Sequence, residues 1–289
     1  MSIDVSIGWL FILLRYKLEN YSITFATLNC LEYTKKCINS LIDSGTDPQK
    51  IAVVDNASTD GTQDYLQSMN LGHVILNREN LSCGAAWNQG ILANQSEWTI
   101  VMNNDIIVPD GFAHGLIKFA IDNNLKLVSP ARIDGSMDYD YDAFYCDAQV
   151  KMSDVVRMGS SNAICMCIHW SLFMHYGFFQ ANPTLLGFED GMFYHALRQA
   201  KVQHATTGQV WIHHFGSVTQ EYMKMVLGIK NENVLVKVND RKLYNQSWLE
   251  RKLYRYELKR SHQQWRKKEI SEHNMTLHGV RKNNEFIWI

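Results

Sequence analysis

Short apolar runs alternate with stretches of helical periodicity over the first half of the chain. The runs cover residues 21–27, 51–54, 73–76 and 98–102. The stretches between them, residues 31–42, 62–69 and 85–93, carry apolar side chains at helical spacing. Strands that alternate with helices in this way predict βαβ units, and therefore an α/β fold with a mostly parallel central sheet.

The pattern loosens after residue 130. Residues 134–147 (DGSMDYDYDAFYCD) contain five aspartates and are expected to form a surface loop. Beyond it we expect strands at 163–168 and 210–212 and helices at 171–176 and 189–200. From residue 221 the chain is rich in Lys, Arg, Glu and Leu, which predicts a C-terminal helical extension. Its expected packing residues are Trp248, Leu249, Leu253, Tyr256 and Leu258.

Residues 1–20 form a separate apolar segment at the N-terminus. Its most apolar part, residues 7–14, is eight residues long, whereas a helix needs about 20 residues to span a bilayer. No charged region precedes it and no small-residue cleavage site follows it, which argues against a signal peptide. The segment therefore either docks on the following domain or anchors the chain at a membrane interface.

Charge is distributed unevenly along a chain whose overall composition is that of an ordinary folded protein. Residues 1–229 have 14 Lys and Arg against 22 Asp and Glu, a balance of −8, and residues 230–289 have 14 against 7, a balance of +7. Acidic residues are interleaved with the basic ones in this tail, so we expect no nucleic-acid binding. Peripheral contact of residues 230–289 with an anionic membrane is the preferred interpretation.

The six cysteines have no paired CxxC spacing, so a zinc ribbon is not expected. Cys165 and Cys167 alternate within an apolar run, which places them on the same face of a buried strand. We interpret all six as reduced thiols of a cytoplasmic protein.

Polar residues follow the predicted strands at their carboxyl ends. Thr27, Asp55 and the run Asn103-Asn104-Asp105 all occupy such positions. Because ligands of open α/β sheets bind beyond the carboxyl ends of the strands, these residues are expected to meet in one site.

Two motifs in this region fit a nucleotide. In VVDNASTDGT, residues 53–62, a strand ends in Asp55 and a small polar turn can present a carboxylate and N–H groups to a base and ribose. In NLSCGAAWNQG, residues 80–90, small side chains let a helix N-terminus approach a phosphate. The alternatives are an N-capped helix start for the first motif and tight helix packing for the second.

Three further groups could carry metal or proton chemistry. Asp105, flanked by amide side chains, suits a divalent cation that bridges a diphosphate, although a simple Asx turn would give the same sequence. Glu189 and Asp190 open a helix and supply a candidate general base, or else cap that helix. His213 and His214 complete a metal site or are core histidines.

Taken in order, these motifs resemble glycosyltransferase family 2, which has the GT-A fold, and most closely its bacterial polysaccharide and O-antigen members. The resemblance covers about residues 21–220 and rests on ITFATLN, VVDNASTDGT, the helix start at 80–90, NNDIIVP, GFED and HHFGS. It implies a GT-A catalytic domain at 21–220, between the apolar segment 1–20 and a basic helical extension at 221–289.

The resemblance also implies roles for individual residues. Asp190, beside Glu189, would be the catalytic base that deprotonates an acceptor hydroxyl. Asp105 would hold Mn²⁺ or Mg²⁺, assisted by His214 or His213 and by Asn103. The nucleotide-sugar donor would be bound by Thr27, Asn29, Asp55, Asn56, Asp60, Asn80, Gly84, Asn88 and Asn104. The implied reaction is inverting and transfers a sugar from a nucleoside-diphosphate donor to a glycan or lipid-linked acceptor. It would serve polysaccharide biosynthesis on the cytoplasmic side of a membrane.

The chain departs from the family pattern in two places. Asn103-Asn104-Asp105 provides one carboxylate where many members have two or three. Met192 and Ala196 stand where members have an acidic residue and an arginine, although His195 and Arg198 lie nearby. These departures leave open a catalytically inactive homologue that serves as a binding or scaffold subunit. A sugar-nucleotide pyrophosphorylase is disfavoured because no glycine-rich loop follows the first strand.

Overall fold

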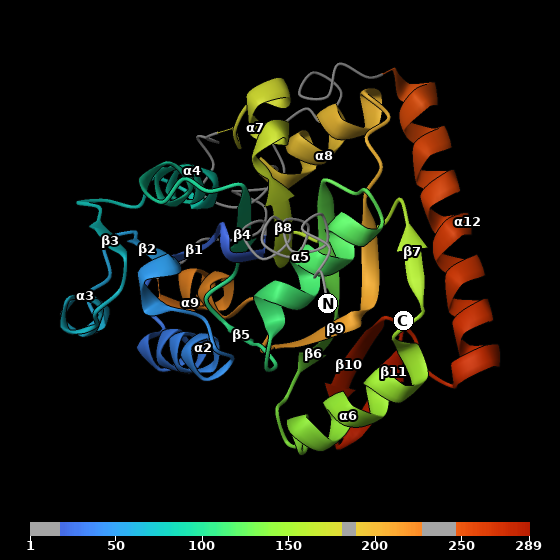
Figure 1. Ribbon diagram of the computed structural model, residues 1–289, viewed down its shortest axis with the longest axis horizontal. Helices are drawn as coiled ribbons and strands as arrows, with labels where there is room; N and C mark the ends of the chain where they lie inside the picture. The colour runs from blue at the N-terminus through green and yellow to red at the C-terminus, as the bar shows by residue number, and fades with distance from the viewer. Residues whose placement is uncertain (1–17, 181–188, 227–246) are drawn as a thin grey trace, which may run out of the picture.

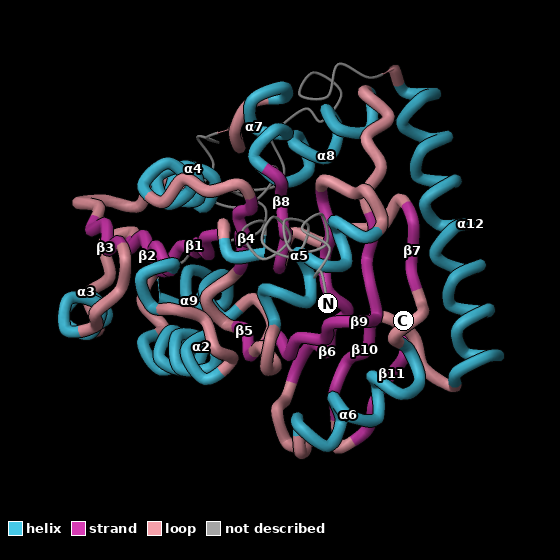
Figure 2. Tube along the Cα trace, in the orientation of Figure 1, coloured by secondary structure: helices cyan, strands magenta, loops and turns pink. Residues whose placement is uncertain are grey.

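The computed structural model describes residues 18–180, 189–226 and 247–289. The predicted apolar run at 7–14 lies outside the described residues. The mixed sheet follows the order β11-β10-β6-β8-β4-β1-β2-β3, and β9 joins it beside β6 (Figure 1). Figure 2 shows the helices covering both sides of these strands.

The first four long strands form the parallel half of the sheet. β1 (Tyr21–Thr27) lies between β2 (Ile51–Asp55) and β4 (Trp98–Met102), and β3 (His73–Leu76) extends the edge beside β2. All four are parallel, as expected for successive βαβ units. Consequently the carboxyl ends of β1, β2 and β4 meet at one edge.

The second half of the sheet mixes directions. β8 (Cys165–His169) is antiparallel to β4 and β6 (Leu127–Gly135), whereas β9 (Ala205–His214) is parallel to β6. Two short strands, β5 (Ile106–Ile107) and β7 (Val156–Met158), pair antiparallel with β9. β9 thus reaches the loop after β4 and brings its last residues to the same edge.

Helices cover both faces of the sheet because strand residues alternate between two cores. Val101 packs against one cluster while its neighbours Ile100 and Met102 pack against another. The first cluster includes α4 (Cys83–Ala93), α7 (Trp170–Tyr176) and α8 (Glu189–Gln199). The second includes α2 (Leu31–Asp43) and α5 (Phe112–Asp122). The remaining connections contain α3 (Thr62–Ser68) and the 3₁₀ turn η1 (Pro48–Lys50).

The cysteines behave as the sequence indicates. Cys165 and Cys167 are fully buried and belong to the same core cluster, so they face the same side of β8. All six cysteines are free thiols.

The acidic stretch at 134–147 is not a surface loop, contrary to the prediction. β6 continues to Gly135, and α6 (Tyr141–Met152) begins within the stretch. Asp140 caps α6 by accepting a hydrogen bond from the Ala143 N–H at 3.0 Å. Tyr141, Ala148 and Met152 are buried along one helical face, a pattern that the density of aspartates obscured.

The C-terminal region contains the expected helices and an unexpected hairpin. α9 (Val218–Val226) and α12 (Trp248–His273) are helical, but β10 (His278–Lys282) and β11 (Glu285–Trp288) form an antiparallel pair. β10 also pairs in parallel with β6, so the end of the chain extends the central sheet. No helix in the described ranges is long and apolar enough to cross a membrane.

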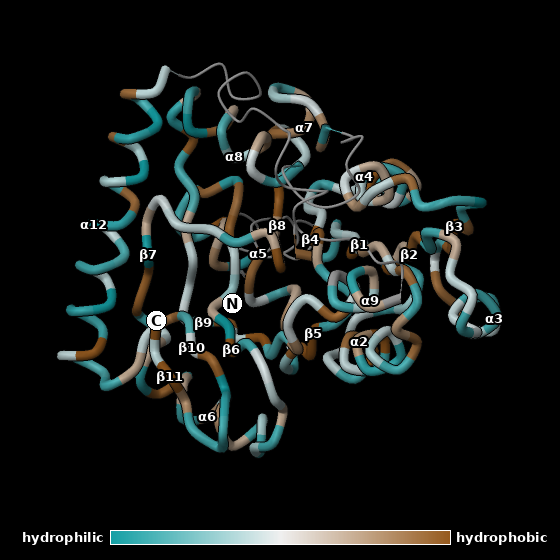
Figure 3. The backbone as a smooth tube through the Cα atoms, turned by 180° about the vertical axis from the view of Figure 1, so that it is seen from behind, coloured by the Kyte–Doolittle hydropathy of each residue, from teal (hydrophilic) through white to brown (hydrophobic). Residues whose placement is uncertain are grey.

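The expected packing residues of α12 are exposed instead. Trp248, Leu249, Leu253 and Tyr256 each expose more than half of their surface, and Leu258 is 38% exposed. The buried residue of the helix is Glu269, which pairs with Arg157. Figure 3 shows the contrast between the hydrophobic central strands and the largely hydrophilic α12.

Candidate functional site

A pocket of about 130 Å³ lies at the carboxyl ends of β1 and β4. Six of the predicted site residues line it: Thr27, Asn56, Asn80, Asn103, Asn104 and Asp105. The parallel pairing of β1 with β2 and β4 brings together residues up to 78 positions apart, from Thr27 to Asp105. The sheet topology therefore assembles the site that the strand-end residues predict.

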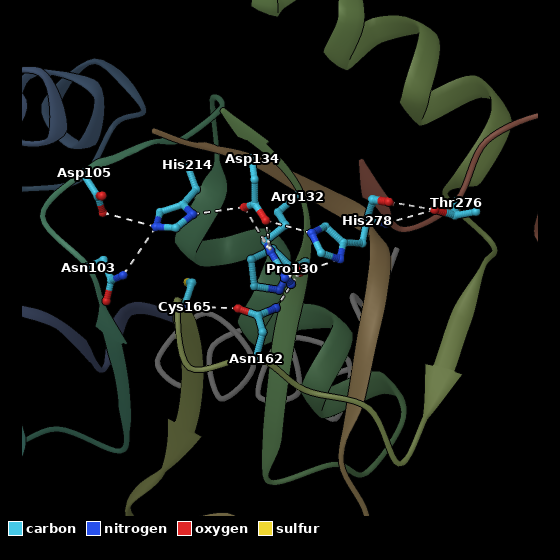
Figure 4. Close-up of polar contacts among 10 residues, drawn as sticks. All are labelled: Asn103, Asp105, Pro130, Arg132, Asp134, Asn162, Cys165, His214, Thr276 and His278. Carbon is cyan, nitrogen blue, oxygen red and sulfur yellow. Dashed lines mark hydrogen bonds and ion pairs between the residues drawn. The ribbon is translucent and has the colours of Figure 1, made fainter. Parts of the chain in front are cut away.

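Asp105, His214 and Asn103 lie together beside this pocket (Figure 4). Oδ1 of Asp105 lies 3.4 Å from Nε2 of His214, and Asn103 Nδ2 lies 3.5 Å from the same nitrogen. Both Asp105 and His214 are buried. Asp105 Oδ2 accepts the Val218 N–H at 3.3 Å, whereas Oδ1 has no hydrogen-bond partner in the described structure. Its nearest charged neighbour is His214 Nε2 at 3.4 Å, so this buried oxygen faces either a protonated imidazole or a ligand.

The other nitrogen of His214 is held by Asp134. Nδ1 of His214 lies 3.0 Å from Oδ1 of Asp134, and Asp134 also contacts Arg132 and His278. Burial lowers the pKa of His214, but the hydrogen bonds and charges of Asp105 and Asp134 outweigh it and raise that pKa to about 9. Burial opposes ionisation of Asp134, yet its bonds to His214 and His278 hold its pKa well below the ordinary value.

The residues fit a divalent cation that is shared with a diphosphate. No cluster of three or more His, Cys, Asp or Glu side chains suited to a metal occurs in the described part of the chain. Asp105 Oδ1 could supply one ligand atom, and His214 Nε2 could supply a second only when a cation displaces its proton; Asp134 fixes the imidazole through Nδ1. Cations that bind together with phosphates commonly take only one or two protein carboxylates.

His213 lies on the opposite face of β9 from His214. Its Nδ1 is 2.9 Å from the Tyr139 hydroxyl, and its ring packs against Phe215. Burial, together with the charge of His214, lowers the pKa of His213 to about 4. The structure therefore brings His214, and not His213, to Asp105.

Asp55 is fully buried at the end of β2. Its Oδ1 accepts hydrogen bonds from Ser58 N–H at 2.9 Å and Gln63 Nε2 at 2.7 Å. Its Oδ2 has no partner among the described residues, so it has one acceptor left for a ligand. Asn56 is held next to it by Asn77 and by the carbonyl of Ser82.

Other predicted donor residues hold the surrounding loops in place. Asn29 accepts the Thr59 N–H through Oδ1 at 2.8 Å, and Asp60 accepts the Leu31 N–H at 2.9 Å. Asn104 donates to Thr27 Oγ1 at 3.2 Å and to Thr34 Oγ1 at 3.1 Å. These hydrogen bonds connect the loops that follow β1, β2 and β4.

The N-terminal half of α4 contributes a second wall. Asn80 Oδ1 accepts the Ser82 N–H at 3.0 Å just before the helix. Asn88 does not face the pocket but exchanges two hydrogen bonds with the backbone of Phe179. Gly84 is required by close packing, since a Cβ there would lie 2.5 Å from Cγ of Glu189.

Glu189 and Asp190 open α8 against this wall. Gly84 N–H points to Glu189 Oε1 at 3.5 Å, and burial raises the pKa of Glu189 to about 7. Burial likewise raises the pKa of Asp190. Neither carboxylate lines the pocket itself, but both lie close enough to Cys83, which does, to help raise its pKa.

Sequence reasoning missed two contributors. Ser217, Val218 and Thr219 line the pocket at the start of α9, where Thr219 Oγ1 donates to Asn104 Oδ1 at 3.4 Å. A Gly-Ser pair before an amphipathic stretch was the available signal. Asp134 belongs to the acidic run that was assigned to a loop, and nothing in the neighbouring sequence indicates its contact with His214.

Comparison with solved structures identifies the fold. GalNAc-T7 with UDP, GalNAc and Mn²⁺ is similar at a TM-score of 0.54 and 12% identity, over 68% of this chain and 43% of that one. Mannosyltransferase PcManGT from Pyrobaculum calidifontis, with GDP-Man and Mn²⁺, is similar at a TM-score of 0.51 and 14% identity, over 73% of this chain and 64% of that one. TarS residues 1–349 from S. aureus, with UDP-GlcNAc, is similar at a TM-score of 0.52 and 14% identity, over 69% of this chain and 61% of that one.

At these identities the similarity shows the fold alone, and it confirms the expected GT-A architecture with its mostly parallel sheet and C-terminal helix. The aligned part of this chain spans less than two-thirds of each of the three proteins. No curated protein matches the chain by sequence. The model of the family described as "Glycosyl transferase family 2" matches residues 22–175, which is more than half of the 289 residues. The chain therefore belongs to glycosyl transferase family 2.

Proposed function

We propose that this chain is a metal-assisted, inverting glycosyltransferase that moves a sugar from a nucleoside-diphosphate donor to a hydroxyl group. The observation that carries the proposal is the buried pair Asp105 and His214, whose facing atoms lie 3.4 Å apart beside the strand-end pocket. Family membership and the free acceptor atoms of Asp55 and Asp105 support it.

The walls of the pocket suit a nucleoside diphosphate. Asp55 does not line the pocket, but its Oδ2 has no partner among the described residues and is proposed to accept an N–H of the base. Thr27 and Asn104, which line the pocket and are hydrogen-bonded to each other, are proposed to position the ribose. The N-termini of α4 and α9 approach the pocket through Cys83 and Val218 and favour negative charge. Mn²⁺ or Mg²⁺ bound by Asp105 and His214 would neutralise charge on the departing diphosphate.

Asp190 is proposed as the general base. Burial raises its pKa, which makes its carboxylate a stronger base than an exposed aspartate. The acceptor oxygen forms a bond to the anomeric carbon while the bond to the diphosphate oxygen breaks, and the hydroxyl proton passes to Asp190. A single in-line displacement of this kind inverts the anomeric configuration. Glu189 continues to accept the Gly84 N–H and forms part of the acceptor side of the site.

A catalytically inactive homologue that binds a nucleotide sugar is the second candidate. The single carboxylate of Asn103-Asn104-Asp105 favours it, as do Met192 and Ala196 in place of the family's acidic residue and arginine. Such a protein would bind the donor and release no nucleoside diphosphate.

The exposed side chains of α12 support an acceptor that lies at a membrane. Trp248, Leu249, Leu253 and Tyr256 are exposed on its first turns, where Lys252 and Lys259 are also exposed. Exposed apolar and cationic side chains on one helix suit an anionic lipid surface. We propose that α12 contacts the cytoplasmic face of a membrane, where lipid-linked glycan acceptors are found.

Calorimetric titration of UDP, GDP and dTDP, with and without Mn²⁺, tests the donor site directly. We expect one nucleotide to bind, with an affinity that Mn²⁺ increases in the wild type and not in Asp105→Ala. Asp110→Ala is the matched control, because Asp110 is exposed in the turn that follows β5. Absence of binding by all three nucleotides, or an equal Mn²⁺ effect in Asp105→Ala, would contradict the proposal.

A further inference from the structure

A second cavity of about 290 Å³ lies between the sheet and α12. It shares no lining residue with the strand-end pocket. Its size is near the lower end of the roughly 300–1,000 Å³ range of small-molecule sites. Three arginines line it, namely Arg132 on β6, Arg157 on β7 and Arg198 on α8.

Two of these arginines are neutralised and one is not. Arg157 pairs with Glu269 at 2.6 Å, and Arg132 pairs with Asp134 at 3.1 Å. Arg198 instead donates to the Tyr254 hydroxyl at 2.8 Å and lies 3.2 Å from His195 Nδ1. No carboxylate of the described residues contacts Arg198. The cavity therefore has a surplus of positive charge.

The remaining lining divides into a polar side and an apolar side. Ser160, Ser161 and Asn162 follow one another on the polar side, and Thr206 donates to Ser160 Oγ at 3.2 Å. Tyr254, Leu258 and Trp265 of α12, with Leu277, form the apolar side. The Arg198 guanidinium lies over the Tyr254 ring at 3.9 Å, and His262 packs against Trp265, so the groups that suit the hydroxyls of a sugar are those of the polar side.

The cavity also lies next to the candidate base. Tyr194 lines it and follows Asp190 by four residues on α8, which is about 6 Å along a helix.

We propose that this cavity binds an anionic saccharide, through contact of its phosphate or carboxylate group with Arg198 and of its hydroxyl groups with Ser160, Ser161 and Asn162. That the bound molecule is the acceptor of the transfer rests on the proposed function. The binding itself does not, because the cavity is separate from the donor pocket. Guanidinium groups are well suited to oxyanions, since they offer two parallel N–H donors.

Binding of a hexose 1-phosphate, a hexuronate, the neutral hexose and inorganic phosphate, measured by calorimetry without nucleotide or metal, tests the proposal. We expect one of the two anionic sugars to bind more tightly than the neutral hexose and than inorganic phosphate. Arg198→Gln should weaken this binding by about 10- to 100-fold, as expected for loss of a charged hydrogen-bond donor. Arg198→Lys should retain part of it.

Two control variants distinguish binding in this cavity from binding elsewhere on the protein. Arg260→Gln removes an exposed arginine of α12 outside the cavity and should bind as the wild type does. Lys267→Gln removes an exposed cation of the same helix outside the cavity and should also bind normally. Because nucleotide and metal are absent from the assay, this binding is measured independently of the donor pocket. Equal binding by the wild type and a folded Arg198→Gln, a preference for the neutral hexose, or no binding of either anionic sugar would overturn the proposal.

Discussion

Oδ1 of Asp134 lies 3.0 Å from Nδ1 of His214, on the side of the imidazole opposite Asp105 (Figure 4). Through its second oxygen Asp134 contacts His278 at 2.7 Å, so the C-terminal hairpin and the candidate metal site share one carboxylate. The contact lies where β10 pairs with β6 and extends the central sheet.

Replacing Asp134 with Asn should weaken Mn²⁺ binding by roughly 10- to 100-fold, because the orientation of His214 would no longer be fixed. The measurement is free Mn²⁺ by electron paramagnetic resonance in the presence of the nucleotide that binds. Asp138→Asn is the matched control, since Asp138 pairs with Arg281 of the same hairpin and not with His214. Equal Mn²⁺ affinity in both variants would contradict the positioning role.

Replacing Glu269 with Gln should destabilise the fold by about 3–5 kcal/mol, because it leaves the buried guanidinium of Arg157 without its charge partner. Both side chains of this pair are at most 6% exposed. Chemical denaturation measures the change in the free energy of unfolding. Glu272→Gln, at an exposed position of the same helix, should change it by less than about 1 kcal/mol. A small effect at Glu269 would show that the pair does not hold α12 to the sheet.

The Glu189 carboxyl gives the protein a specific pH dependence. Burial raises its pKa from an ordinary 4.5 to about 7, so its ionisation destabilises the folded state. Relative to Glu189→Gln, the wild type should lose roughly 3 kcal/mol of stability as pH rises from about 4.5 to about 7, and no more above that. Unfolding of both proteins across this range measures the difference. Parallel stability curves would show that Glu189 ionises normally.

Exposed apolar residues on α12 should mediate vesicle binding. Leu249→Glu together with Leu253→Glu should abolish sedimentation with anionic vesicles, because these substitutions replace exposed apolar surface with negative charge. The control Val150→Glu changes an apolar residue that is 86% exposed on α6 and should leave binding intact. Failure of the wild type to bind at low salt would exclude this membrane contact.

The order of elements through β4 could be predicted from the sequence because each of these strands is a short apolar run that a polar residue ends or follows. Trp98–Met102, followed by Asn103-Asn104-Asp105, is the clearest case. Local patterns of this kind depend only on neighbouring residues, and parallel pairing then fixes which strand ends meet.

The rest depends on contacts between distant residues. Whether His213 or His214 faces Asp105 is decided by the register of β9 against β5, which a dipeptide cannot reveal. Asp134 is one of five aspartates in its stretch, and only the pairing of β6 with β9 and β10 singles it out. The apolar residues of α12 suggested packing, but polar contacts attach the helix, among them the buried pair of Glu269 and Arg157 and the bond from Arg198 to Tyr254.

Release of nucleoside diphosphate from UDP-, GDP- and dTDP-sugars, with and without Mn²⁺, tests the central claim most directly. We expect release from one class of donor, dependent on Mn²⁺ and on an added acceptor. It should fall at least about 100-fold in Asp190→Asn, where the base is lost, and also in Asp105→Ala. Donor binding without any release of nucleoside diphosphate would contradict the account and favour the inactive homologue. Release that is unchanged in both variants would also contradict it and would favour a different site.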